Sequence, residues 1–95
     1  IVFVDVTADW CITCKANEVG VLFQNPVYKA LQGQNVVLMP GDWTRPSDYV
    51  TNYLKAHNRY GVPFNKVYGP GAPQGIELPV ILTPQAVMAA FENAR

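Results

Sequence analysis

The 95-residue sequence carries little charge, and its acidic and basic residues balance. Charged residues make up 15% of the chain, seven basic against seven acidic, which gives a formal net charge of +0 at pH 7. With no basic excess, neither nucleic acid nor an anionic membrane surface is expected as a partner. Hydrophobic residues still make up 49% of the chain, enough for a packed core, and the length allows one small domain.

The sequence also lacks a long hydrophobic run. The apolar run that opens the chain, Ile1–Val4, is cut by Asp5, and no run approaches the roughly 20 residues that a membrane-spanning helix needs. It shows no signal peptide and no initiator Met. Because the chain opens inside a hydrophobic segment, we expect residues 1–95 to form a single domain cut from a longer protein.

Cysteine and histidine are scarce, with two Cys and one His in the chain. Two cysteines are too few for a domain held together by several disulfides. They are also too few for a zinc site, since His57 is the only histidine that could join them. No metal is therefore expected, and the chemistry of the cysteines themselves becomes the main question.

Hydrophobic patterning predicts an α/β domain with the order β-α-α-β-α-β-β-α. A parallel start followed by an antiparallel hairpin predicts a mixed sheet with helices on both faces. Gly69–Gly75 is expected to be a turn-rich loop, and Pro79 marks an edge strand or a bulge. The predicted strands are 1–7, 36–42, 64–68 and 76–82, and the predicted helices are 11–24, 26–31, 48–60 and a last one starting at Pro84 after the cap Thr83.

The strongest chemical signal is the pair Cys11 and Cys14, which directly follows the first strand and opens the first helix. At a helix N-terminus, free N–H groups and the helix dipole favour a thiolate at Cys11. That thiolate can attack a substrate disulfide. Cys14 lies one turn later on the same helix face and can resolve the mixed disulfide. The motif therefore predicts a redox-active Cys11–Cys14 disulfide.

The pair has three other interpretations: a structural disulfide, half of a metal site, and two inert buried thiols. A disulfide that spans two residues removes little chain entropy, so stability is a poor reason for it. A metal site would need ligands beyond His57, and none is clustered nearby. The redox interpretation is favoured over all three.

Residues 4–15, which contain the run Trp10-Cys11-Ile12-Thr13-Cys14-Lys15, resemble the active-site segment of the thioredoxin superfamily. More narrowly, they resemble the C-terminal thioredoxin-like domain of the DsbD and ScsB thiol:disulfide interchange proteins. Residues 61–63 and 78–83 are similar to the end of that domain. Ile12 and Thr13 replace the Gly-Pro of thioredoxin, so its redox potential does not carry over. The resemblance implies a thioredoxin-like fold that lacks the N-terminal strand and helix of full thioredoxin.

Two acids are candidates for handling protons beside the cysteines. Asp5 stands in a strand expected to be buried, where a carboxylate is costly and its pKa tends to rise. The resemblance places it beneath the pair as proton acceptor for Cys14; the alternative is an acid satisfied by Lys or by backbone. Glu18 follows Cys14 by four residues and shares its helix face. It is either a second functional acid, as the resemblance suggests, or a solvated partner of Lys15.

The resemblance also implies a docking surface for substrate proteins. Trp10 is expected to flank Cys11 as a partly exposed aromatic, although plain core packing is the alternative. The Val62–Pro63 bond is expected to be cis, against the usual preference for trans. Backbone groups of Val62 would then be free to pair with an extended substrate segment.

The function predicted on this basis is thiol:disulfide oxidoreductase, specifically a protein-disulfide reductase. The resemblance implies a periplasmic domain of a bacterial inner-membrane protein. It would take electrons from a membrane-embedded cysteine pair and pass them to periplasmic protein partners, with no cofactor besides its own disulfide. The alternatives are a stand-alone periplasmic reductase, for instance in cytochrome c maturation, and a non-catalytic or metal-binding thioredoxin-like module.

Overall fold

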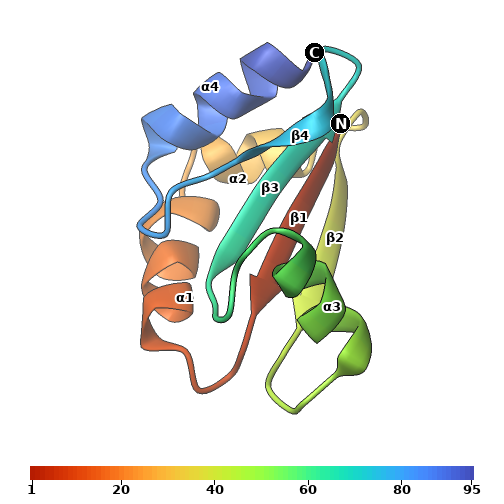
Figure 1. Ribbon diagram of the computed structural model, residues 1–95. Coiled ribbons are helices and arrows are strands. Elements are labelled where there is room, and N and C mark those ends of the chain that lie inside the picture. The colour runs from red at the N-terminus through yellow and green to blue at the C-terminus, as the bar shows by residue number, and fades with distance from the viewer.

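A mixed four-stranded sheet forms the centre of the computed structural model, which describes residues 1–95 (Figure 1). Its order is β2-β1-β3-β4, with β1 parallel to β2 and the other two pairs antiparallel. This confirms the predicted parallel start and antiparallel hairpin. The strands are β1 (Val2–Thr7), β2 (Val37–Asp42), β3 (Phe64–Gly69) and β4 (Ala72–Glu77).

Two of the helices begin at a side-chain N-cap, and the cap predicted at Thr83 is confirmed. The Oγ atom of Ser47 accepts the Val50 N–H at 3.4 Å, and Oγ1 of Thr83 accepts the Ala86 N–H at 3.1 Å. The helical elements are α1 (Ile12–Asn17), the π-helix η1 (Glu18–Leu22), α2 (Val27–Leu31), α3 (Asp48–Ala56) and α4 (Pro84–Ala94). No helix is both long and apolar enough to cross a membrane.

The alternating side chains of β1 divide the core between the two faces of the sheet. Phe3 packs with η1, α2 and α4 in the larger cluster, where its ring meets that of Phe91 edge-on at 6.0 Å. Val6 points to the other face and packs with Leu54 of α3 and Phe64 of β3. The structure thus has α1, α2 and α4 on one face and α3 on the other, as Figure 1 shows. Asp5 lies on the Phe3 side by the same alternation.

The strand predicted at 76–82 is wrong in position, and so is the loop at Gly69–Gly75. The chain turns within two residues after β3, so β4 starts at Ala72 and ends at Glu77. Glycine makes the tight turn possible, because a Cβ at Gly71 would meet the backbone of Asn93 and Arg95. Within β4, Gly75 has φ +89, and a Cβ there would collide with the side chains of Lys66 and Tyr68. Since β4 is an edge strand, its Pro73 is tolerated, and Pro79 falls beyond the strand.

Three predicted helices also differ from the structure. The helix expected over 11–24 changes at Glu18 into a π-helix, closed by the bond from the Phe23 N–H to the Glu18 carbonyl at 2.8 Å. The helix expected over 48–60 ends at Ala56, because Asn58 adopts a left-handed conformation with φ 57. The short helix expected over 26–31 starts one residue later, at Val27.

His57 is a packed histidine on the α3 face. Its Nδ1 lies 2.8 Å from the Tyr53 carbonyl oxygen, which can only accept, so Nδ1 carries the proton. Nε2 is then the acceptor for the Nζ of Lys66, also at 2.8 Å. The hydroxyls of Tyr53 and Tyr68 complete this polar cluster at 2.9 Å from each other. It lies on the face of the sheet opposite α1.

Candidate active site

The two cysteines form a disulfide at the junction between β1 and α1. Cys11 is the N-cap of α1, and its Sγ accepts the Cys14 N–H at 3.1 Å. The Cα atoms of the pair are 5.2 Å apart, a distance usual for disulfides. The turn before the helix is held by the Cys11 N–H, which donates to the Ala8 carbonyl at 3.1 Å. The strand-to-helix junction predicted from the sequence is therefore present, with a sulfur atom at the helix start.

Both cysteines are buried, Cys14 slightly more deeply than Cys11. Cys14 is 1% exposed and Cys11 is 6% exposed. Both pack with Ala8 in a small apolar cluster, against which Val62 lies. A partner can therefore approach Cys11 more readily than Cys14, which suits the predicted roles of attacking and resolving thiol.

Asp5 is a largely buried acid on the α1 side of β1. Its Oδ1 accepts a hydrogen bond of 2.7 Å from Nδ2 of Asn65, the residue opposite it on β3. Burial raises the pKa of the Asp5 carboxyl above its ordinary value, and the negative charge of Glu18 adds to that rise. The hydrogen bond from Asn65 lowers the pKa of Asp5, because it stabilises the ionised form. The rise in the pKa of Asp5 confirms this part of the sequence prediction.

Glu18 begins η1 and is half-buried. Its backbone N–H donates to the carbonyls of Cys14 and Lys15, so it closes the helical turn that carries Cys14. Its negative charge makes the smallest of the three contributions to the pKa of Asp5, and it raises that pKa. The two acids therefore approach the same region from the strand and from the helix. Their catalytic role stays a prediction.

Of the predicted docking residues, Trp10 directly precedes Cys11, and Val62 with the following Pro63 comes just before β3. Trp10 is 59% exposed, and its ring is held by a 3.1 Å bond from Nε1 to the Thr44 carbonyl. Val62 packs against the cysteine cluster. The Val62–Pro63 bond is cis, as the resemblance implies. That these residues bind partners remains a prediction.

Two buried asparagines near the site were not identified from the sequence. Asn65 is 2% exposed and holds Asp5, and Asn17 is 5% exposed and binds the backbone between β4 and α4. An Asn inside a predicted strand or on a predicted buried helix face is the signal that could have revealed them. Such an amide needs partners when it is buried.

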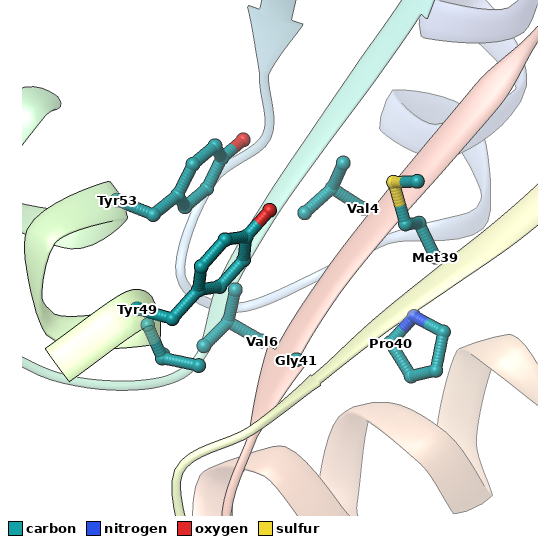
Figure 2. Close-up of a pocket in the computed structure, with 8 residues that line it drawn as sticks. Val4, Val6, Met39, Pro40, Gly41, Tyr49 and Tyr53 are labelled. Atoms are coloured by element: carbon teal, nitrogen blue, oxygen red, sulfur yellow. The ribbon is translucent and has the colours of Figure 1, made fainter. Parts of the chain in front are cut away.

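A hollow lies on the opposite face of the sheet, between α3 and the β1–β2 pair (Figure 2). Figure 2 shows the rings of Tyr49 and Tyr53 on one side of this hollow, beside Val4, Val6 and Met39. The hollow has a volume of about 150 Å³, and its lining holds no acid, histidine or cysteine. It is therefore separate from the disulfide. No group of three or more His, Cys, Asp or Glu side chains that could hold a metal ion occurs in the structure.

Comparison with known proteins decides the family. The sequence profile described as thioredoxin-like matches residues 1–70. The chain belongs to the thioredoxin-like family. A comparison of this thioredoxin-like domain with curated proteins finds no match.

Solved structures agree with the thioredoxin-like assignment. The oxidised C-terminal domain of Neisseria meningitidis DsbD is 25% identical with a TM-score of 0.74, and the match covers 99% of this chain and 79% of that one. The reduced form of the same domain is 25% identical with a TM-score of 0.73, covering 99% and 80%. This thioredoxin-like domain therefore shares its fold with a DsbD C-terminal domain, and its disulfide stands at the start of the helix after β1, an arrangement suited to thiol:disulfide exchange.

Proposed function

We propose that this thioredoxin-like domain is a protein-disulfide reductase that works by dithiol–disulfide exchange. The observation that carries the proposal is the Cys11–Cys14 disulfide at the start of α1, with both cysteines buried and Cys14 slightly more deeply than Cys11. The likeness to the DsbD C-terminal domain in both oxidised and reduced forms supports it.

The reaction starts from the dithiol form. The Cys11 thiolate attacks one sulfur of a partner disulfide, a new bond forms between Cys11 and that sulfur, and the partner's other sulfur leaves as a thiolate that takes up a proton. Cys14, once deprotonated, attacks the Sγ of Cys11 and releases the second partner sulfur. The partner disulfide gains two electrons and two protons, and the Cys11–Cys14 pair loses them.

Asp5 is the proposed acceptor of the Cys14 proton in the second step. Burial and the charge of Glu18 raise the pKa of Asp5, which makes its carboxylate a stronger base than an ordinary one. The bond from Asn65 fixes the position of the carboxyl group. Glu18 is the proposed second acid, acting on the same site through its charge.

The oxidised domain has to be reduced again by another dithiol. We propose a membrane-embedded cysteine pair as that donor and periplasmic proteins as the acceptors, which makes this chain a periplasmic domain of an inner-membrane protein. Likeness to a DsbD C-terminal domain supports this relay. A stand-alone reductase uses the same chemistry at Cys11 and Cys14 and differs only in the donor.

Reduction of insulin disulfides by dithiothreitol, followed by turbidity, tests the proposal. The wild-type domain should accelerate the reaction, and Cys11→Ser should abolish the acceleration. Asn52→Leu changes an exposed residue on α3 and serves as a control that should keep full activity. A wild-type domain that does not accelerate reduction would instead identify a non-catalytic thioredoxin-like module.

A further inference from the structure

The side chain of Asn17 joins α1 to the segment between β4 and α4. Its Nδ2 donates to the Val80 carbonyl at 2.9 Å, and its Oδ1 accepts the Leu82 N–H at 3.1 Å. The amide thus meets a backbone acceptor and a backbone donor two residues apart, as a neighbouring strand would. These two hydrogen bonds are the only ones that a side chain of α1 makes with this segment. Asn17 is therefore the main polar link between the segment and α1.

The tied segment displays three apolar residues in succession, Pro79, Val80 and Ile81, which we call the apolar knob. All three are exposed, with Ile81 at 66%. The flanking Leu78 and Leu82 are buried in the main core and anchor the knob from both sides. A short segment with buried ends and three exposed apolar side chains is organised to present them to solvent, and core packing does not explain it.

The apolar knob lies close to the disulfide because of where Asn17 stands. Asn17 follows Cys14 by three residues on α1, which corresponds to about 4.5 Å along the helix axis. Figure 1 shows the β4–α4 connection running beside this part of the chain. A partner that buries about 800 Å² against the domain covers a patch with a radius of about 16 Å. A protein docked over Cys11 and Cys14 therefore also reaches the knob.

We propose that Asn17 is a positioning residue that holds the apolar knob against an apolar side chain flanking the partner's cysteine. The inference rests on the proposed reductase function. Asn17 then sets affinity for protein disulfides and leaves the thiol chemistry unchanged. A small-molecule disulfide, too small to touch the knob while it reacts at Cys11, should not sense Asn17.

The test compares Asn17→Leu, Ile81→Ser and the double variant with wild type and the Asn52→Leu control. Each is assayed with insulin as the protein disulfide and with 5,5′-dithiobis(2-nitrobenzoate) as the small one. We expect Asn17→Leu to lower kcat/KM for insulin about five- to tenfold through KM, as expected for the loss of one or two hydrogen bonds. The rate with the small disulfide and the reduction potential against glutathione should stay at the wild-type values. Because Asn17 acts through the knob, the double variant should be no slower than the slower single variant.

Three results would overturn the proposal: equal losses with both substrates, a changed reduction potential, or additive losses in the double variant. If Asn17→Leu fails to fold, Ile81→Ser carries the test alone, and an unchanged KM for insulin refutes the role of the knob. A wild-type domain that reduces neither disulfide refutes the reductase function itself, a result distinguishable from all of these.

Discussion

Asp5 is a largely buried acid whose replacement should stabilise the fold and slow the chemistry. Its pKa in the folded state is raised above the ordinary value of 3.8, chiefly by burial. The folded state therefore favours the protonated form. The stabilising contribution of that form is fully present below pH 3.8 and is lost as pH rises through the folded-state pKa. At pH 7 the ionised carboxylate destabilises the fold, and Asp5→Asn should remove that cost.

The size of the effect follows from the surroundings of the carboxyl group. An imperfectly satisfied buried polar group costs about 1–3 kcal/mol. The 2.7 Å bond from Asn65 offsets part of that cost, and an amide at position 5 can still accept it. We expect Asp5→Asn to raise the free energy of unfolding at pH 7 by about 1 kcal/mol. The urea midpoint should then rise by about 1 M, because m is about 1 kcal/mol/M for a small domain.

The assay is urea unfolding of the oxidised domain at pH 7 and at about pH 3, where the gain should vanish. Asp9→Asn is the matched control, since Asp9 is an exposed acid and its removal changes net charge equally. In the reduced domain, Asp5→Asn should slow release of the mixed disulfide about 100-fold, the size of effect expected when a general base is lost. An equal gain in stability at both pH values, or none at pH 7, would refute the reasoning.

Two further predictions concern the charge around the thiols and the conformation of β4. Asp5→Asn combined with Glu18→Gln should shift the pH profile of Cys11 alkylation to lower pH, because nearby negative charge disfavours the thiolate. The shift should exceed that of either single change, and an unchanged profile would show that both acids are only structural. Gly75→Ala should destabilise the fold by at least about 1–2 kcal/mol, measured by thermal unfolding, since φ is +89 and the added methyl group meets the Lys66 side chain. Gly20→Ala, where nothing lies within 4 Å of the added Cβ, should be neutral or stabilising, and a reversed order of the two would contradict the account.

The parts of the fold that local chemistry determines were predictable from the sequence. Thr83 and Pro84 specify the start of α4, and Ser47 specifies the start of α3, because each cap satisfies N–H groups of its own first turn. The cysteine pair was predictable for the same reason, since its position after an apolar strand is itself a local signal. The order of strands and helices followed from these signals and from hydrophobic patterning.

The features that depend on distant contacts were not predictable. The turn before β4 is set by Gly71, where a Cβ would meet the backbone of α4's last residues, a contact that no local pattern contains. From the sequence, Asn17 is an ordinary polar helix residue. Its role appears only when the fold brings Val80 and Leu82, which are 63 and 65 residues further along the chain, beside it. Asn65 likewise becomes meaningful only when β3 is paired with β1, which places it opposite Asp5.

The most direct test of the account is to identify which cysteine captures a partner. Reduced Cys14→Ser and Cys11→Ser domains are each incubated with insulin, quenched with acid and examined by non-reducing electrophoresis and mass spectrometry. The account predicts a stable mixed disulfide at Cys11 in the Cys14→Ser domain and little or none in the Cys11→Ser domain, because Cys14 is buried at 1% exposure. Capture by Cys14 in the Cys11→Ser domain, with none by Cys11 in the other, would contradict it.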